Sequence, residues 1–184
     1  MQVAVEPESD PDAAPGDRVR AACLRVGEAE FVRRCAAVLV DPSAHGALLP
    51  LLGDVPAYAF LPSGEPSYWV PVWATRALLY AWDPSASPAV VTGLRHENWR
   101  VREMSAKVCA KREIGEAGDV LATLATDPIP RVRAAAARAL GLVGESEHAD
   151  ALRLLRDDAE SSVRVAADRA LRVLSRRLDR DLSY

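Results

Sequence analysis

The residues of this chain best suited to chemistry are arginine and lysine side chains that recur every 31 residues. Guanidinium and ammonium groups on one face of a repeat can bind a carboxylate-rich protein segment or a phosphate backbone by charge-assisted contacts. Alternatively, this face is only solvated, and Glu103, Asp168 and the acidic N-terminal segment neutralise it. The row consists of Arg76, Lys107, Arg138 and Arg169, spaced by 31 residues, with Arg100 and Arg131 at nearly the same helical phase.

Aromatic side chains gather between residues 58 and 99 and form a second candidate site. We expect the proline-rich segment 54–68 to be a loop insertion, and insertions of this kind often lie at binding faces. Exposed Trp and Tyr side chains beside arginine make strong interaction hot spots. Alternatively, Trp69 and Trp73, which are four residues apart, only cover the end of the core. The candidate aromatic residues are Tyr68, Trp69, Trp73 and Trp99.

Familiar catalytic and metal-binding patterns do not occur in the sequence. His45, His96 and His148 are isolated, and none has a cysteine or carboxylate at zinc-ligand spacing. There is no glycine-rich phosphate loop and no nucleophile elbow. The three cysteines are odd in number and widely separated, which is typical of reduced thiols in a cytoplasmic protein. We therefore expect neither a metal nor a cofactor.

An internal repeat supplies the elements that must position the cations. The segments 98–109, 129–140 and 160–171 align without a gap, and each contains a Val-Arg pair. A degenerate fourth copy lies one period upstream, where Pro71 follows Val70 in place of the arginine. A single copy cannot bury its apolar face alone, so the copies are expected to stack on one another.

Each copy is expected to contain two helices joined by a turn. In the second copy the helices span 119–126 and 131–143, because the apolar residues of the latter fall on one helical face and prolines occupy the turn. The third copy ends in the longest helix, from residue 161 to about 179, whose arginine-rich end suits a capping element. Weaker helical patterns occur at 31–40 and 47–52.

The pattern Leu-x-x-Asp-x-x-x-x-Val-Arg-x-x-Ala-x-x-Ala-Leu-Gly, best matched from Leu124 to Gly141, resembles short HEAT repeats. Repeats of this kind include the HEAT-like bilin lyase repeats and those of many bacterial helical-repeat proteins. The resemblance covers residues 69–178 well and 18–53 weakly. It implies an all-α fold, an α-solenoid with a right-handed superhelix of about five hairpins. The second helices would line its concave surface and turn the cation row into a stripe along a groove.

The resemblance also implies a structural role for the arginine that follows each core valine. These arginines would pair with an acid in the preceding turn and hold the repeat together. The arginines are Arg102, Arg133 and Arg164. The matching acids are Asp127 and Asp158, and His96 takes the place of the acid in the first copy.

The segment Trp99-x-x-x-Glu103 is similar to the Trp-x-x-x-Asp arrangement of HEAT-like DNA glycosylases that remove alkylated bases. The resemblance implies that an aromatic ring and a carboxylate meet a damaged nucleotide in the groove. Here the acid is Glu rather than Asp, and only one copy contains it. Its helical phase of about 200° from the core valine predicts an exposed side chain. Glu103 is therefore the single weak catalytic candidate.

Composition limits the class of protein. The 184 residues are 49% hydrophobic and 27% charged, which excludes a disordered or collagen-like chain. Residues 1–17 are acidic and proline-rich, and we expect a disordered tail that is either solvated or shields a basic surface. The solenoid domain then spans 18–184. No apolar run reaches the roughly 18 residues of a membrane helix, and no signal peptide is visible. We therefore expect a cytoplasmic protein without membrane contact.

The sequence favours a non-enzymatic scaffold for protein-protein interaction, which binds a protein or acidic peptide in a basic, aromatic-flanked concave groove. The alternative is nucleic-acid binding, with excision of alkylated bases as a remote enzymatic extension. A lyase-like or chaperone role toward a tetrapyrrole follows from the family resemblance alone, and no residue singles it out.

Overall fold

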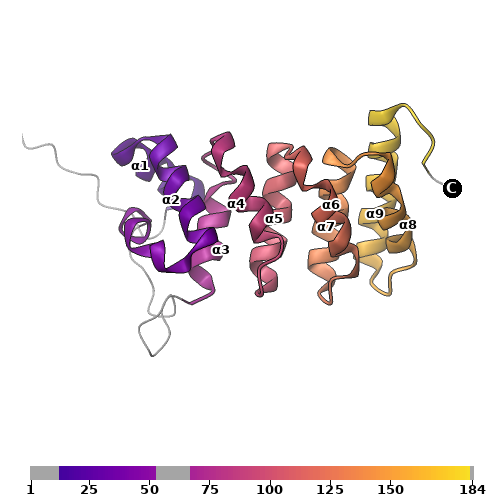
Figure 1. Ribbon diagram of the computed structural model, residues 1–184, viewed down its shortest axis with the longest axis horizontal. Helices are drawn as coiled ribbons and strands as arrows, with labels where there is room; N and C mark the ends of the chain where they lie inside the picture. The colour runs from indigo at the N-terminus through magenta and orange to yellow at the C-terminus, as the bar shows by residue number, and fades with distance from the viewer. Residues whose placement is uncertain (1–12, 53–66, 183–184) are drawn as a thin grey trace, which may run out of the picture. The chain divides into compact units, whose positions relative to one another are not determined.

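The structure is a computed structural model that describes residues 13–52 and 67–182, and every regular element in these ranges is a helix (Figure 1). The predicted all-α class is confirmed for this part of the chain. The chain divides into two compact units, unit 1 (Met1–Ala86) and unit 2 (Ser87–Tyr184). The domain predicted over 18–184 thus spans both units. No described helix is both long and apolar enough to cross a membrane.

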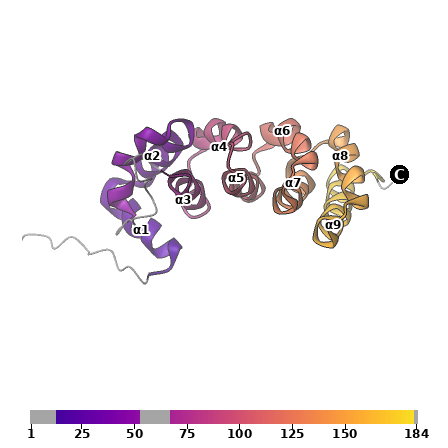
Figure 2. The ribbon, with the colours of Figure 1, turned by 90° about the horizontal axis from the view of Figure 1, so that it is seen from below.

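Unit 2 consists of three helical hairpins of similar build. Within this unit, α5, α7 and α9 lie side by side in one layer, and α4, α6 and α8 form the other layer (Figure 2). The hairpins are α4 (Ser87–Gly93) with α5 (Trp99–Arg112), α6 (Gly118–Thr123) with α7 (Pro130–Val143), and α8 (Ala149–Leu154) with α9 (Ser161–Leu178). Short 3-10 helices flank the first helices of the last two pairs: η5 (Gly115–Ala117), η6 (Leu124–Thr126), η7 (Ser146–His148) and η8 (Leu155–Asp157).

The helices predicted from the repeat agree closely with those observed. The helix predicted over 119–126 is α6 continued by η6, and the one predicted over 131–143 is α7, which begins one residue earlier at Pro130. Proline suits the first turn because the N–H that it lacks has no partner inside the helix. Helix α9 has 18 residues and ends at Leu178, and the next residue, Asp179, caps it with a left-handed φ of 50°.

Unit 1 contains longer irregular stretches. Its described elements are α1 (Pro15–Val26), α2 (Glu28–Val40), η1 (Pro42–Ala47), η2 (Leu49–Leu51), α3 (Trp69–Ala77) and η4 (Pro84–Ala86). Helix α2 contains the segment predicted to be helical at 31–40 and packs against α1 and α3.

Two predictions for unit 1 need correction. Helix α1 begins at Pro15, so the last three residues of the predicted disordered tail are helical. Residues 1–12 of that tail, and residues 54–66 of the predicted loop insertion, lie outside the described residues. The segment predicted as a helix at 47–52 consists of 3-10 turns, because Pro50 lacks the N–H that an α-helix would use there.

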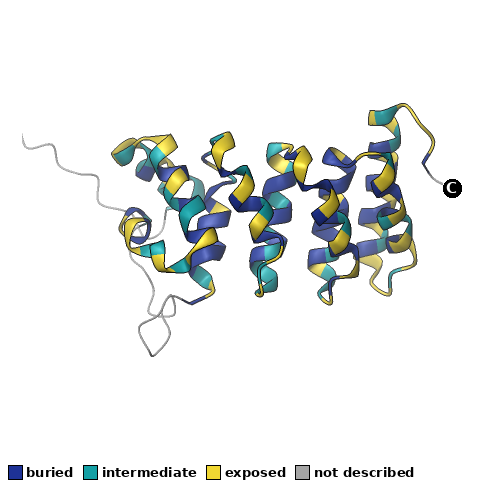
Figure 3. Ribbon diagram, in the orientation of Figure 1, coloured by how far each residue is buried: buried dark blue, intermediate teal, exposed yellow. Residues whose placement is uncertain are grey.

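Small and β-branched residues make the core of unit 2 dense. The valines that define the repeat, Val101, Val132 and Val163, are completely buried. Buried and exposed bands alternate along each helix of this unit (Figure 3). A Cβ added at Gly141 of α7 would lie 2.9 Å from the Cα of Ala170 in α9. Glycine at this position therefore permits the two helices to approach closely.

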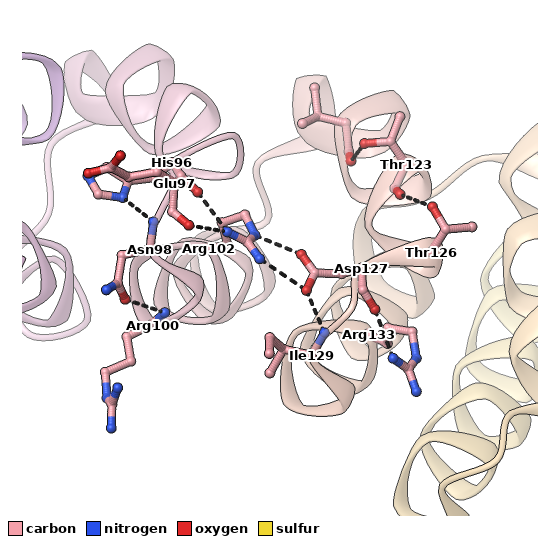
Figure 4. A network of polar contacts seen from close by, with 11 residues as sticks. His96, Glu97, Asn98, Arg100, Arg102, Thr123, Thr126, Asp127, Ile129 and Arg133 are labelled. Atoms are coloured by element: carbon pink, nitrogen blue, oxygen red, sulfur yellow. Dashed lines mark hydrogen bonds and ion pairs between the residues drawn. The ribbon is translucent and has the colours of Figure 1, made fainter.

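Arginine and aspartate side chains link one hairpin of unit 2 to the next. Arg102 of α5 binds Asp127 through two hydrogen bonds, Nε to Oδ2 at 2.7 Å and Nη2 to Oδ1 at 3.1 Å (Figure 4). Arg133 binds Asp158 in the same way, at 2.6 and 2.8 Å. In both pairs the aspartate lies 25 residues after the arginine. We call these two pairs the Arg-Asp ladder.

The ion pairs of the Arg-Asp ladder differ from the predicted ones. Each arginine was expected to bind an acid of the turn before its own helix, but the acid comes from the turn of the following hairpin. The preceding turn contributes main-chain carbonyls instead: Nη1 of Arg133 donates to the carbonyl of Asp127 at 2.8 Å. Arg164 donates in the same way to the carbonyls of Asp158 and Ala159. The long arginine side chain reaches the next hairpin because stacking brings that hairpin's turn beside it.

The turn acids also order their own turns. Asp127 accepts a hydrogen bond from the N–H of Ile129 at 2.9 Å, as Asp158 does from Glu160 at 2.8 Å. In the first copy Nδ1 of His96 accepts the equivalent bond from Asn98 at 2.9 Å. Burial lowers the pKa of His96, which favours the neutral ring that this bond requires. His96 thus replaces the acid as an acceptor within its turn.

A buried hydroxyl in α5 provides a first test of this packing. Ser105 occupies the place of Ala136 and Ala167 in the next repeats, and its Oγ has no hydrogen-bond partner among the described residues. Ser105→Ala removes that unsatisfied group, so we expect the free energy of unfolding to rise by about 1 kcal/mol, measured by urea denaturation. Ser175→Ala is the control, because Ser175 Oγ accepts a bond from the N–H of Leu182 at 3.1 Å. A loss of stability in Ser105→Ala equal to that of the control would contradict this account.

The ladder should contribute measurably to stability. Only 7% of the Asp158 side chain and 15% of the Arg133 side chain are exposed. Asp158→Asn leaves a buried guanidinium without its counter-charge, so we expect a loss of about 2 kcal/mol in the free energy of unfolding. Asp157→Asn, at the exposed neighbouring position, is the matched control and should change little. Equal effects of the two substitutions would show that the pair contributes nothing.

The ion pair between Arg133 and Asp158 should also make the free energy of unfolding depend on pH. The hydrogen bonds from Arg133 hold the pKa of Asp158 below its ordinary value of 3.8. The stabilisation is therefore fully present above pH 3.8 and disappears as the pH falls through the lowered pKa of the folded protein. Denaturation of the parent protein and of Asp158→Asn along a pH series should give a stability difference that shrinks below pH 3.8. A difference that stays constant across this range would disprove the assignment.

Candidate binding surface

Three cations of the predicted row occupy one position on three neighbouring helices of unit 2. Lys107 lies on α5, Arg138 on α7 and Arg169 on α9, and the 31-residue repeat puts them at the same helical phase. Arg138 and Arg169 are exposed and make no ion pair with any described residue. Lys107 is 41% exposed and pairs with Glu103. We call Lys107, Arg138 and Arg169 the cation row.

Two further cations, Arg100 and Arg131, lie over the ring of Trp99 at the start of α5, and we call these three residues the Trp99 group. The guanidinium carbon of Arg100 lies 4.5 Å from the centroid of the Trp99 ring, and that of Arg131 lies 5.3 Å from it. Both distances are within the range of cation–π attraction, which orients the guanidinium groups over the ring. Arg131 belongs to α7, so this contact joins two neighbouring hairpins. Trp99 is half-buried, which leaves part of the ring accessible.

Glu103 is buried, and the prediction that it lies exposed is wrong. Its exposed fraction is 6%, and its Oε1 lies 2.8 Å from Nζ of Lys107 and 3.1 Å from Nη2 of Arg131. The helical phase was measured from the core valine within one hairpin. In the stack, α7 packs against α5 and covers the face that would otherwise be exposed. The equivalent residue in the next repeat, Ala134, is buried in the same way.

The Trp99 group and the cation row both lie on the second helices α5, α7 and α9, and Glu103 links them. Glu103 is shared by Lys107 and Arg131, and the side chain of Arg131 remains 66% exposed. Near the row, Asp168 is paired with Arg156 at 3.1 Å. On α5, α7 and α9 the carboxylates Glu103 and Asp168 thus accompany the cations Arg100, Lys107, Arg131, Arg138 and Arg169. The excess of positive charge suits an anionic partner.

The remaining predicted site residues belong to unit 1. The rings of Tyr68 and Trp69 lie 5.1 Å apart between centroids, and those of Trp69 and Trp73 stack at 6.4 Å. The two tryptophans are half-buried on α3, Tyr68 is exposed at its start, and Arg76 is exposed near its end. These four residues thus gather around one helix. Partial burial fits packing at the end of the core and also leaves ring surface for a partner.

Sequence reasoning missed three features of unit 2. It did not foresee the contacts of Arg100 and Arg131 with the Trp99 ring, although adjacency in the chain and a near-repeat spacing of 32 residues were both visible. It did not foresee the bridge from Glu103 to Arg131. It also missed a hollow of about 550 Å³ along α9, which is lined by Asp168, Arg156, Arg172 and Arg176, among others. Two of these arginines belong to the polar end predicted to cap the array.

The thiols and potential metal ligands give no sign of a reactive centre. Burial raises the pKa of Cys109 to about 12 and also raises the pKa of Cys35, so both thiols stay protonated at neutral pH. In the ranges 13–52 and 67–182, no three His, Cys, Asp or Glu residues gather in a group that could hold a metal ion.

Comparison with known proteins agrees with this architecture. Residues 112–172 match the family model for HEAT repeats. Among solved structures, the complex of CpcE and CpcF of phycocyanin lyase from Nostoc sp. PCC7120 contains a similar chain. It shares 20% sequence identity with this one at a TM-score of 0.58, with 96% of this chain and 70% of that chain covered. No curated protein matches the chain significantly.

Residues 112–172 thus have the sequence pattern of HEAT repeats, and the predicted α-solenoid fold is confirmed. At 20% identity the similarity to the lyase complex establishes the fold alone. One fold of this kind hosts many functions, so function has to be argued from the surface.

Substitution of Glu103 tests whether its ion pairs with Lys107 and Arg131 stabilise the fold. Glu103→Gln keeps the shape but removes the charge that Lys107 and Arg131 share, so we expect the free energy of unfolding to fall by about 1–2 kcal/mol. Urea denaturation measures the effect, and Glu116→Gln, at an exposed site, is the control. Indistinguishable midpoints for the two variants would mean that the buried ion pairs are energetically neutral.

Proposed function

We propose that this protein is a non-enzymatic scaffold whose unit 2 binds an acidic segment of a partner protein on the layer formed by α5, α7 and α9. The observation that supports this most directly is the cation row. Arg138 and Arg169 are exposed, make no ion pair among the described residues, and repeat the position of Lys107. Carboxylates of a partner would form charge-assisted hydrogen bonds with these groups.

The surface around the row also suits a polypeptide. Trp99 presents an aromatic ring beside two guanidinium groups, a combination that is enriched in protein interfaces. Leu142, four residues after Arg138 on α7, is 43% exposed and offers an apolar contact near the row. The similar solved structure is a complex of two proteins, which adds support for a protein partner.

The environment of Glu103 favours binding over catalysis. A general acid or base has to reach the reacting group of a substrate. Glu103 is buried and engaged by Lys107 and Arg131, so its carboxylate holds the basic surface together. The aromatic group of unit 1, Tyr68, Trp69 and Trp73 with Arg76, is proposed as a further contact surface for a protein partner.

Nucleic-acid binding is the second candidate, and the Trp99 group favours it specifically. An aromatic ring flanked by arginine is suited to base stacking next to phosphate contacts. Base excision would be its enzymatic extension, with Glu103 as the catalytic group. Loss of alkylated-base release in Glu103→Gln, with binding retained, would support that extension.

Charge reversal tests the proposed surface. In Arg138→Glu/Arg169→Glu we expect the affinity for a fluorescently labelled oligoglutamate to fall about tenfold or more, since two attractive contacts become repulsive. Fluorescence anisotropy measures the affinity. The matched control is Arg95→Glu/Arg180→Glu, which changes the net charge equally at exposed positions of unit 2 outside the row. Equal losses in both double variants would show only a general effect of charge.

The same assay separates the two candidate partners. Labelled duplex DNA, single-stranded DNA and RNA are measured beside oligoglutamate at about 50 and 200 mM salt. Nucleic-acid binding that is tighter than peptide binding, and that falls with a log–log salt slope of several units, would replace the protein-partner proposal. Preference for the peptide would support it.

A further inference from the structure

We infer that the cation row binds an extended acidic segment whose carboxylates recur at every third residue. This inference rests on the proposed function and specifies the partner of the same surface. It depends on the regular spacing of Lys107, Arg138 and Arg169, which occupy one position on three consecutive second helices.

The distance between neighbouring cations follows from helix packing. Axes of packed helices lie about 8–10 Å apart, depending on the side chains at the contact. The contact of α7 with α9 is close, because a Cβ at Gly141 would lie 2.9 Å from the Cα of Ala170. The contact of α5 with α7 is short enough for Arg131 to reach both Glu103 and the ring of Trp99. The helix positions that carry the three cations are therefore expected to recur at intervals of roughly 9 Å.

An extended chain of the polyproline II type repeats at the same distance. It has about three residues per turn and rises about 3.1 Å per residue, so every third side chain points the same way at intervals of about 9 Å. In a β-strand, side chains on one face recur every second residue, about 7 Å apart. An α-helix provides a comparable interval, about 10 Å, only at every seventh residue. Period three is thus the shortest polypeptide pattern that matches the row.

The immediate surroundings leave the row available to such a segment. Arg138 and Arg169 make no ion pair with any described residue, and Asp168, which precedes Arg169, is engaged by Arg156. Lys107 pairs with Glu103 but shares that carboxylate with Arg131. The exposed Leu142 lies about one helical turn after Arg138 on α7 and can contact an apolar side chain of the segment next to the row. This apolar contact favours a polypeptide over a bare phosphate chain.

Three labelled peptides of equal length and composition test the period. They carry three glutamates at every second, every third or every seventh residue, and affinity is measured by fluorescence anisotropy with the full chain. We expect the period-three peptide to bind about fivefold tighter than the other two, because it alone engages three cations without ordering a long helix. Equal affinity for all three would overturn the inferred period while the proposed acidic partner stands. Absence of binding to every peptide, and to oligoglutamate, would overturn both.

A double-mutant cycle then tests the register residue by residue. Arg138→Ala is combined with replacement of the middle glutamate of the period-three peptide by glutamine. We expect each change alone to weaken binding about threefold, and the second change to add little once the first is made. Arg95→Ala, an exposed position outside the row, is the matched control and should show no coupling with that glutamate. Additive effects of Arg138→Ala and the peptide change would contradict the direct contact.

Discussion

The paired hydrogen bonds between an arginine of one hairpin and an aspartate of the next determine how unit 2 is assembled. Arg102 and Arg133 each hold carbonyls of their own turn and, at the same time, a carboxylate 25 residues further on. The aspartates in turn order the start of the next helix by accepting a main-chain N–H. One carboxylate therefore connects the turn, the helix and the neighbouring hairpin. Because the groups are largely buried, a shift in register would leave charges without partners, which is costly.

This constraint has a consequence for the surface. Successive hairpins related by one period must present equivalent side chains at equivalent places. Lys107, Arg138 and Arg169 are therefore aligned by the same contacts that hold the stack. Close helix packing at Gly141 then limits the interval between Arg138 on α7 and Arg169 on α9. A surface of this kind suits an extended partner, because both have a regular spacing along one direction.

The Trp99 group shows how one position can depart from the repeat. Glu103 stands where the next copies have alanine and valine, and its carboxylate binds a cation from each of two helices. This bridge keeps Arg131 near the ring of Trp99 while leaving most of its side chain exposed. A buried acid thus positions exposed cations, and in the proposed function it would act on recognition without touching the partner.

The period, the helices and the phase of each cation follow from the spacing of residues along the chain. The spacing of the core valines predicts α7 and α9 within a residue or two, and it places Arg138 and Arg169 away from the core. The partner of Arg102, the burial of Glu103 and the contacts of Trp99 were decided by the tertiary structure. The physical reason is that helical periodicity describes one helix in isolation. Which of its faces a neighbouring hairpin covers, and which turn an arginine can reach, depends on how the hairpins stack.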